Sequence, residues 1–519
     1  MSALQAASLI QPGDRIVFVG DSITGQGGNG GAGGWVGLIG SGLKNQNPES
    51  HQVLVALGGS GQTVGGWTNV ERKSRTAPTF LDVKTFDLQV ELGQHADVVV
   101  IMLGMNDVLS PSMAGTPESI QKWSDNYRLL INALRERTTP RLVALATPTP
   151  CTEDPVGPKN VVMDKMVEAL TKLAAEEKCI VLPTRALSWE ILDQGRRLKP
   201  DFHFVGDQVH PNPYGHAAIA AGMLKGFGEV AASTATVEKA LASLKAQAGA
   251  DALSYQWSLP PQMPAADGSL RFQLNVYHPT GQVKAEFPEG WSSKETAAKT
   301  GSGETVFLVT AKLDRLVNRV VLRAGSVTRE ATIPAPWLVG SGNIGRVGWK
   351  ANVYDREAGK LPADEAVRTG VGFAEAMPQV ELKPGVPLVW KPFVSSVNYG
   401  GNGAPGAVDF AGITFFSGGE VGYGLRWIQS DKEREVTVKI AKLGFAGSPY
   451  LEVWSNGETV FTGDSAKARG QDFKTTLKAG WNLISFKSNF SQWQWQFSID
   501  LEPAAGDSLD ALRYSIVPR

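Results

Sequence analysis

The sequence predicts a multidomain protein in which an α/β domain is followed by all-β domains. The first ~230 residues alternate short apolar strands with longer helical segments, which is the pattern of a parallel sheet with crossover helices. From about Tyr255 onward, strand-like segments alternate with turn residues, and little helical periodicity remains. The length of 519 residues also exceeds one core, since a domain takes roughly 150 residues.

Five short apolar segments are the predicted strands of the α/β domain, which we place at residues 1–235. They are rich in β-branched residues and leucine, as expected for strands that a parallel sheet buries on both faces. The segments are Arg15 to Val19, Val53 to Leu57, Val98 to Leu103, Leu142 to Thr147 and Ile180 to Pro183.

Helices are predicted between and after these strands. The clearest one begins at Thr116 and Pro117, a capping residue followed by a proline in the first turn. A second helix spans about Val161 to Ala174, and a third, Pro213 to Phe227, is rich in small residues that allow close packing on the sheet. Residues 236–254 form a predicted helical linker. The apolar face of the first helix consists of Ile120, Trp123, Tyr127, Leu130, Ile131 and Leu134.

The rest of the chain predicts two β domains. Residues 255–338 have the size and strand pattern of an immunoglobulin-like sandwich. Residues 339–519 resemble a carbohydrate-binding jelly roll in their size and strand pattern. Within them, Asn456 and Gly457 stand between two strand-like segments and predict a hairpin, because this pair suits the turn that matches strand twist. The strands of the first β domain are Arg271 to Tyr277, Gln282 to Phe287, Thr305 to Ala311, Arg319 to Arg323 and Val327 to Ile333.

Charge and hydropathy argue against two classes of function. A formal net charge of −1 provides no basic field for binding nucleic acid. No apolar run approaches the ~20 residues that cross a bilayer, so no membrane span is expected. The start, Met1 to Pro12, lacks the features of a signal peptide. A secreted or periplasmic protein is expected if a leader was removed and a cytoplasmic one otherwise, and the oligomeric state stays open.

The two cysteines are expected to be free thiols. Cys151 follows the fourth predicted strand and Cys179 begins the fifth, so in a parallel sheet they lie near opposite edges. Neither belongs to a C-x-x-C pair or a metal-ligand pattern, which favours structural burial and leaves a redox role undecided.

Residues suited to catalysis follow three of the predicted strands. Ser22 comes after the first, Gly61 after the second and Asn106 after the third. The carboxyl ends of parallel strands meet at one edge of a sheet, where open α/β sheets bind ligands. Asp207 and His210 stand just before the third helix, and their spacing places a carboxylate and an imidazole within reach of each other.

Together these residues can carry out nucleophilic catalysis. A serine hydroxyl needs a base to take its proton, and a neutral imidazole oriented by a carboxylate is the usual solution. Ser22, His210 and Asp207 are the candidate nucleophile, base and orienting acid. Candidate donors to the oxyanion are the backbone N–H groups of Ser22 and Gly61 and the side-chain amide of Asn106.

Four blocks resemble those of the SGNH, or GDSL, hydrolase family and occur in that family's order, over about residues 12–230. The resemblance implies a flavodoxin-like sheet of strand order 2-1-3-4-5 and ester hydrolysis through an acyl-enzyme, with no cofactor and no metal. There is one departure: Ala56 stands where many members carry asparagine, so a supporting hydrogen bond is missing there. The blocks are Gly20-Asp21-Ser22-Ile23, Ser60-Gly61-x-Thr63, Gly104-x-Asn106-Asp107 and Asp207-x-x-His210-Pro211.

Several of these residues also have a structural interpretation. Ser22 can be a helix cap, and Asp21 and Asp107 are expected to bond to nearby backbone. Trp35 and Trp67 lie close to the blocks, where they either line an acyl or sugar pocket or pack in the core.

Two ligand-binding alternatives are also weighed. His203, Asp207 and His210 could act as metal ligands, but no further ligand cluster is evident in the sequence. The run Gly25 to Gly34 lacks the Gly-Lys-Ser/Thr ending of a phosphate loop, so a flexible loop beside the serine is predicted.

The resulting hypothesis is a serine esterase, most concretely a carbohydrate O-acetylesterase that removes acetyl groups from a polysaccharide or oligosaccharide. The β domains favour a glycan by association only. One strand face carries Trp493, Trp495 and Phe497, which either stack on sugar rings or fill a sandwich core, and we favour the core. The alternatives are a lipase or thioesterase acting on lipid or small esters, and a non-catalytic glycan-binding or scaffold protein.

Overall fold

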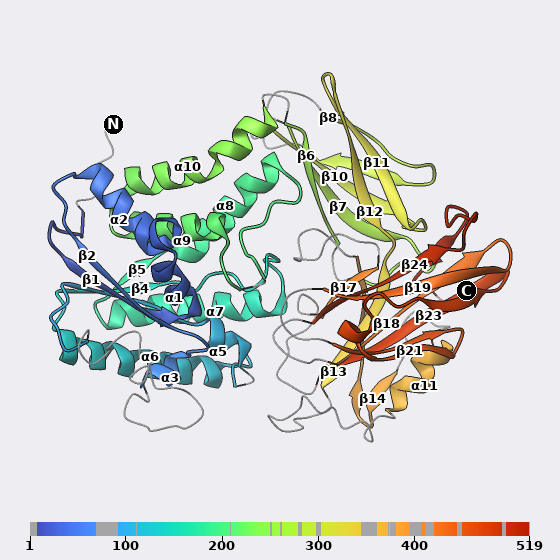
Figure 1. Cartoon of the computed structure of the whole chain (residues 1–519), viewed down its shortest axis with the longest axis horizontal. Coiled ribbons are helices and arrows are strands. Elements are labelled where there is room, and N and C mark those ends of the chain that lie inside the picture. The colour runs from blue at the N-terminus through green and yellow to red at the C-terminus, as the bar shows by residue number, and fades with distance from the viewer. Residues whose placement is uncertain are drawn as a thin grey trace. The chain divides into compact units, whose positions relative to one another are not determined.

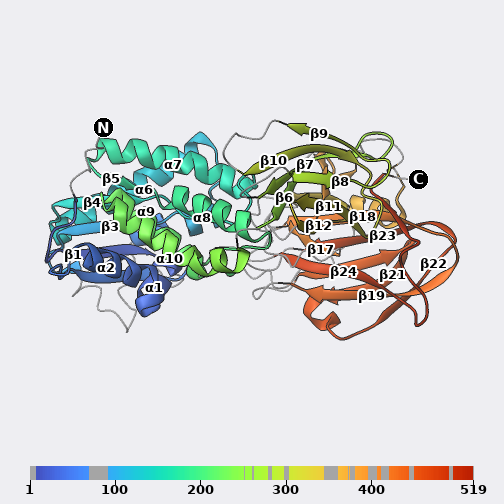
Figure 2. The same cartoon turned by 90° about the horizontal axis from the view of Figure 1, so that it is seen from above.

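The computed structural model of the chain contains two compact units. The first comprises residues 1–195 and 202–247, and the second comprises residues 196–201 and 248–519. The first unit is α/β and the second is mainly β (Figure 1, Figure 2). The structure describes residues 8–68, 92–110, 112–207, 209–249, 252–259, 262–278, 283–296, 303–343, 361–371, 373, 380–394, 406–410, 420–443, 449–489 and 495–517.

A five-stranded parallel sheet forms the centre of the first unit, with strand order β2-β1-β3-β4-β5. All five predicted strands and the strand order that the family resemblance implies are confirmed. Because β1 lies between β2 and β3, the segments that follow these three strands emerge side by side. The strands are β1 (Arg15–Asp21), β2 (Val53–Gly59), β3 (Val98–Met102), β4 (Leu142–Ala146) and β5 (Ile180–Leu182).

Helices cover both faces of this sheet, with α2 and α9 on one face and α6 on the other (Figure 1). The Thr116 side chain caps α6 by accepting a hydrogen bond from the backbone N–H of Ser119 at 3.3 Å, as the sequence predicts. The helices are α1 (Ser22–Asn29), α2 (Trp35–Gln46), α3 (Val64–Thr68), α5 (Met105–Leu109), α6 (Pro117–Thr138), α7 (Pro158–Glu176), α8 (Thr184–Leu198), α9 (Pro213–Gly226) and α10 (Val230–Ala248).

The glycine-rich run after Ser22 differs from its prediction. It was expected to be a flexible loop, whereas residues 22–29 form helix α1 and Gly31–Gly33 form a 3-10 turn. The helix packs directly on β2. A Cβ added at Gly25 would stand 3.2 Å from the Gly58 carbonyl oxygen, and a Cβ added at Gly28 would stand 2.5 Å from the Ala56 Cβ. The glycines therefore allow close packing of a helix on a strand rather than flexibility.

The second unit begins with two antiparallel sheets, of order β6-β7-β10-β9 and β12-β11-β8. Both sheets contribute to one buried apolar cluster, which includes Leu274 and Val309 from the first and Leu322 and Ile333 from the second. The strands are β6 (Ser254–Ser258), β7 (Leu270–Tyr277), β8 (Val283–Glu286), β9 (Ser292–Thr296), β10 (Glu304–Ala311), β11 (Val317–Ala324) and β12 (Val327–Pro334).

The remainder of the second unit contains a seven-stranded and a four-stranded antiparallel sheet. Strand β13 (Trp337–Asn343) pairs with β16 and β18, so the predicted boundary at residue 338 falls inside a strand. The division into an immunoglobulin-like and a jelly-roll domain stays a prediction. The other elements are α11 (Pro362–Thr369), β14 (Glu381–Lys383), β15 (Val386–Pro387), β16 (Val389–Phe393), β17 (Ala407–Asp409), β18 (Glu420–Ser430), β19 (Arg434–Lys442), β20 (Tyr450–Ser455), β21 (Glu458–Asp464), β22 (Phe473–Leu477), β23 (Gly480–Asn489), β24 (Gln496–Pro503) and β25 (Arg513–Ser515).

The second unit contains the predicted hairpin and part of the predicted aromatic face. The hairpin is confirmed: Asn456 and Gly457 join β20 to β21 with φ of +50° and +83°, as the predicted turn requires. Trp495 and Phe497 are both 0% exposed, and the Trp495 ring stacks on Phe410 at 4.5 Å. These two aromatic side chains therefore belong to the core, while Trp493 lies outside the described residues.

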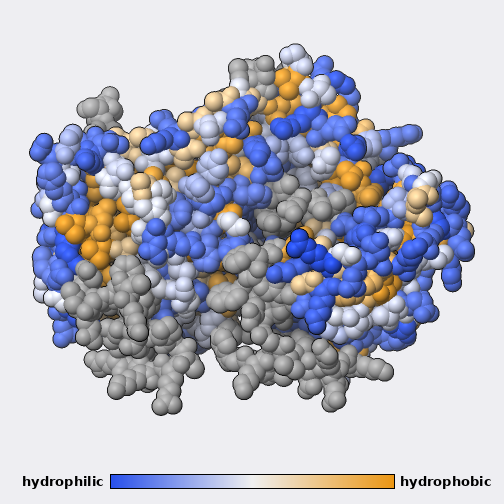
Figure 3. Space-filling view, in the orientation of Figure 1, coloured by the Kyte–Doolittle hydropathy of each residue, from blue (hydrophilic) through white to orange (hydrophobic). Residues whose placement is uncertain are grey.

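No helix within the described ranges is long and apolar enough to cross a membrane. Neither cysteine takes part in a disulfide, and Cys151 is buried while Cys179 is partly buried. On the face drawn in Figure 3, hydrophilic residues dominate and hydrophobic ones form small separate patches.

Candidate active site

Three side chains, one from the start of α1 and two from the segment between α8 and α9, form a continuous line of hydrogen bonds in the first unit. The Ser22 Oγ lies 2.9 Å from the His210 Nε2, and the His210 Nδ1 lies 2.7 Å from the Asp207 Oδ2. The imidazole is 28% exposed and the carboxylate 13%, so this line of groups is accessible from solvent. The structure thus brings together the three residues that the sequence singled out.

Ser22 stands where β1 ends and α1 begins. Asp21, the last residue of the strand, caps the helix by accepting a hydrogen bond from the Ile23 N–H at 2.9 Å. The capping residue is therefore Asp21, and the serine hydroxyl is left to face His210. Ser22 is the first residue of α1, so its N–H has no hydrogen-bond partner within the helix.

Asp207 and His210 lie in a closed loop between α8 and α9. The Asp207 Oδ1 accepts hydrogen bonds from the N–H groups of Val209 at 3.0 Å and His210 at 2.8 Å. The loop is closed by the Gly206 N–H, which donates to the His210 carbonyl at 2.7 Å. One carboxylate oxygen thus shapes the turn while the other holds the imidazole, which explains the three-residue spacing.

This arrangement sets the protonation of the pair. The hydrogen bond to Asp207 raises the pKa of His210 above its usual 6.5, against the effect of partial burial. Burial alone would raise the pKa of Asp207, but the hydrogen bonds that it accepts from His210 and Val209 lower it overall. Asp207 is therefore ionised near neutral pH, as an orienting carboxylate must be.

The loops that follow β2 and β3 are tied together by the third sequence block. The Asn106 Nδ2 donates to the Gln62 carbonyl at 3.0 Å, and both oxygens of Asp107 lie 3.2 Å from the Val64 N. Gly61 has φ of +74°, a left-handed conformation that suits glycine. Since an amide carries two N–H bonds, the bond to Gln62 orients the Asn106 side chain and leaves its second N–H for a ligand.

A family model matches most of the residues that make up this unit. Residues 18–218 match the model of the GDSL-like lipase/acylhydrolase family. The chain contains a GDSL-like domain. This match confirms the resemblance found in the sequence, and it supports a hydrolase that acts on esters.

Solved structures similar to the chain include an α/β-hydrolase enzyme from the metagenome of Lake Arreo, Spain. It is 24% identical, with a TM-score of 0.33, and the match covers 43% of this chain and 99% of that one. An acetylxylan esterase from Geobacillus stearothermophilus is also 24% identical, with a TM-score of 0.33 and coverage of 42% and 96%. The comparison with curated proteins found no match.

Two buried carboxylates brace the GDSL-like domain beneath Ser22. Burial raises the pKa of Asp21 to about 7 and the pKa of Asp107 also to about 7. Both bond to nearby backbone, as the sequence predicts, through Ile23 and Val64. Asp21 and Asp107 therefore hold the backbone at Ile23 and Val64 in place.

Trp35 and Trp67 fit the core-packing alternative rather than a pocket wall. They are 0% and 2% exposed. Their indole N–H groups donate to the carbonyls of Ile23 at 3.0 Å and Gly20 at 3.1 Å. Both rings thus support the backbone on either side of Ser22, which explains their position beside the blocks.

His203 faces a carboxylate that the sequence analysis missed. Its Nδ1 lies 2.8 Å from the Glu153 Oε2, in the loop after β4. No group of three or more histidine, cysteine or acidic side chains that could hold a metal ion occurs in the described part of the chain. Glu153 belongs to no sequence motif, so only its contact with His203 in the folded chain identifies it.

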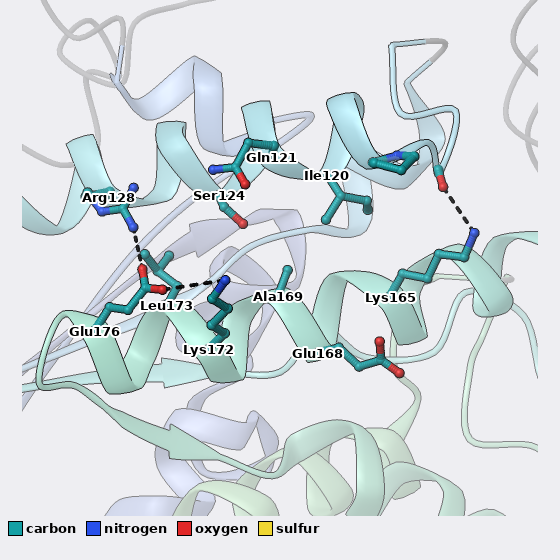
Figure 4. A pocket seen from close by; sticks show the side chains of 12 residues that line it. Ile120, Gln121, Ser124, Arg128, Lys165, Glu168, Ala169, Lys172, Leu173 and Glu176 are labelled. Atoms are coloured by element: carbon teal, nitrogen blue, oxygen red, sulfur yellow. Dashed lines mark hydrogen bonds and ion pairs between the residues drawn. The ribbon is translucent and has the colours of Figure 1, made fainter.

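A separate pocket lies between α6 and α7, with a volume of about 740 Å³. Figure 4 shows Arg128 and Lys172 directed toward Glu176, with Lys165 bonded to a backbone carbonyl. None of the candidate catalytic residues lines this pocket.

Proposed function

We propose that the GDSL-like domain is a serine esterase that works through an acyl-enzyme. The observation that carries the proposal is the unbroken line of hydrogen bonds from the Ser22 hydroxyl through His210 to Asp207. Its position where β1 ends agrees with the edge at which parallel sheets bind ligands. In this proposal Ser22 is the nucleophile, His210 the general base and Asp207 the group that orients it.

In the first half of the reaction the Ser22 Oγ attacks the ester carbonyl carbon while the His210 Nε2 takes the hydroxyl proton. The carbonyl oxygen becomes an oxyanion. When the intermediate collapses, the bond to the alkoxy oxygen breaks, and the imidazolium returns its proton to that oxygen. The alcohol leaves, and the acyl group stays on Ser22.

The second half repeats these steps with water. His210 removes a proton from water, and the resulting hydroxide attacks the acyl carbon. Collapse of the second intermediate releases the acid and returns the proton to the Ser22 Oγ. Throughout, the negative charge of Asp207 stabilises the imidazolium at Nδ1 and keeps Nε2 directed at the serine.

Three donors are proposed for the oxyanion: the N–H groups of Ser22 and Gly61 and the Nδ2 of Asn106. The Asn106 amide is oriented in advance by its bond to Gln62, so little reorganisation is needed as charge develops. A donor of this kind is worth about 3 kcal/mol in the transition state.

For the substrate we propose the acetyl esters of a polysaccharide or oligosaccharide. This part rests on the β-rich second unit, whose strand pattern resembles carbohydrate-binding jelly rolls, and so on an analogy of folds. A lipase or thioesterase would use the same groups on longer acyl chains, and a glycan-binding scaffold would use none of them.

Fluorophosphonate labelling tests the nucleophile directly. We expect the folded wild-type protein to be labelled at Ser22, as located by peptide mass mapping, and S22A to stay unlabelled. An unlabelled wild-type protein, or full ester turnover by S22A, would overturn the proposal.

A panel of nitrophenyl esters and acetylated glycans then tests the substrate. An acetylesterase should prefer acetate over butyrate and octanoate, and it should release acetate from at least one acetylated polysaccharide. A preference for the long chains would instead support the lipase or thioesterase alternative.

A further inference from the structure

Glu153 is a buried carboxylate that does not belong to the line of hydrogen bonds from Ser22 to Asp207. It bonds to the loop that carries Asp207 and His210. Glu153 is 2% exposed and follows β4 in the chain. Its Oε1 accepts the N–H of Phe204 at 2.7 Å and that of Val205 at 3.2 Å. Its Oε2 lies 2.8 Å from the His203 Nδ1. One side chain thus bonds to three consecutive residues of another loop.

These three residues form one side of the closed loop that presents Asp207 and His210. On the other side, the Asn212 N–H donates to the Phe204 carbonyl at 2.9 Å, and its side-chain amide donates to the His203 carbonyl at 2.7 Å. Val205 and Pro211 form an isolated antiparallel bridge between the two sides. The loop is braced internally, and Glu153 bonds it to the segment after β4.

We propose that Glu153 is a positioning residue for the Asp207–His210 pair, an inference that rests on the proposed function. Glu153 does not touch the reacting atoms. It fixes the backbone two and three residues before Asp207, and this backbone sets where the His210 Nε2 stands relative to the Ser22 Oγ. A displacement of about 1 Å at such a site can cost roughly 100-fold in rate.

Glu153→Gln removes the negative charge of the side chain and keeps its length and shape, so it tests position and charge separately. The glutamine Oε1 can still accept both backbone N–H groups, and its Nε2 can donate to a neutral His203 Nδ1. If position is what matters, E153Q keeps most of the rate. Glu153→Ala removes every acceptor, and Glu153→Asp shortens the side chain by one methylene and so retracts the carboxylate from the loop.

Asp14 provides a matched control at the opposite edge of the sheet. It is 3% exposed, precedes β1, and accepts hydrogen bonds from the Gln11 N–H at 2.7 Å and from Arg141. Asp14→Ala therefore also removes a buried carboxylate that holds a loop, but far along β1 from Ser22.

The experiment measures three quantities on the full chain: the rate of Ser22 phosphonylation by a fluorophosphonate, kcat and KM for p-nitrophenyl acetate, and hydrogen exchange of residues 203–212. For E153A we expect the phosphonylation rate and kcat to fall by about 10- to 100-fold, with KM within about threefold and faster exchange in this segment. E153Q should stay within about threefold of wild type and D14A within about twofold. If E153A does not fold, E153D should show the same changes to a smaller extent.

The inference is overturned if E153A or E153D phosphonylates at the wild-type rate, or loses no more rate than D14A at equal loss of thermal stability. It is also overturned if E153Q loses as much as E153A. If wild-type Ser22 is not phosphonylated, the proposed function fails. Hydrogen exchange then still tests whether Glu153 anchors the loop of residues 203–212. Faster exchange of residues 203–212 in E153A but not in D14A supports its anchoring role, and unchanged exchange overturns it.

Discussion

Two contacts between a carboxylate and a basic side chain, one in each unit, have the same length and different surroundings. Asp207 and His210 in the GDSL-like unit lie 2.7 Å apart, as do Asp364 and Lys487 in the β-rich unit. The His210 side chain is 28% exposed, whereas that of Lys487 is 3% exposed. The first pair continues to the Ser22 hydroxyl, and the second continues to the Tyr423 hydroxyl, which donates to Asp364 at 2.6 Å.

The length of a contact between an acid and a base therefore does not identify a functional site. What distinguishes the Asp207–His210 pair is that one member is open to solvent and touches a group that can react. In the Asp364–Lys487 pair the lysine is buried, and a buried charge must be paired because leaving it alone is costly. The first pair is expected to control rate, and the second is expected to control stability.

The largest expected effect tests the catalytic side of the comparison. Ser22→Ala should lower kcat for an activated acetyl ester by about 10⁴-fold or more, because the nucleophile is lost. His95→Ala serves as a control, since His95 is an exposed histidine whose ring bonds to Thr139 and Asp97. It should leave kcat unchanged in the same assay, and wild-type turnover by S22A would show that another group attacks the ester.

Lys487→Met tests the structural side. It leaves the Asp364 carboxylate without its cation, so the free energy of unfolding should fall by about 3–5 kcal/mol while kcat per folded molecule is unchanged. Chemical denaturation measures the first quantity and ester hydrolysis the second. Adding Asp364→Asn should restore part of the stability, and a loss of kcat in the folded variant would contradict the assigned difference.

Two side-chain amides extend the test, that of Asn106, which is partly buried, and that of Asn318, which is buried. Asn106→Ala should lower kcat by about 100- to 1000-fold with little change in KM, because it removes an oxyanion donor. The matched control is Asn318 in the β-rich unit, whose Nδ2 donates to the carbonyls of Arg315 at 2.9 Å and Ile333 at 3.1 Å. Asn318→Ala should lower stability and leave kcat unchanged. If both variants lowered kcat equally, the role of Asn106 as an oxyanion donor would be contradicted.

The pH dependence of activity should report on His210. The base must be neutral to take the serine proton, and the bond to Asp207 raises its pKa above 6.5. In the wild type, kcat/KM should therefore fall as the pH drops through a value above 6.5. In Asp207→Asn the remaining kcat/KM should fall at a lower pH than in the wild type. A fall at the same pH would mean that Asp207 does not raise the pKa of His210.

A further expected effect is a change with pH in the stability of the GDSL-like unit. Burial raises the pKa of Asp107 from 3.8 to about 7, so the folded protein holds this proton where the unfolded chain has lost it. This contribution is fully present below pH 3.8 and is lost as the pH rises through about 7. Asp107→Asn keeps an acceptor for the Val64 N–H, so its unfolding free energy should fall less over this range in denaturant titrations. Parallel curves for the two proteins would contradict the shift.

Much of the fold could be predicted because its signals are local. The five strands of the GDSL-like unit are short apolar runs, and the turn at Asn456 and Gly457 depends on two residues with positive φ. Local patterns failed at residues 25–34, because glycine favours loops over helices when judged alone. The reason for a helix there is its close contact with Gly58 and Ala56 of β2, which belongs to the tertiary structure.

The sequence alone shows which residue types follow each strand and in what order the four blocks occur. The contact of 2.9 Å between Ser22 and His210, which are 188 residues apart, exists only in the folded chain. Only in the folded chain are Trp35 and Trp67 buried, and only there does Glu153 bond to the loop of His210. The physical reason is that a motif specifies groups along the chain, whereas burial, distance and hydrogen-bond partners arise only when distant segments pack together.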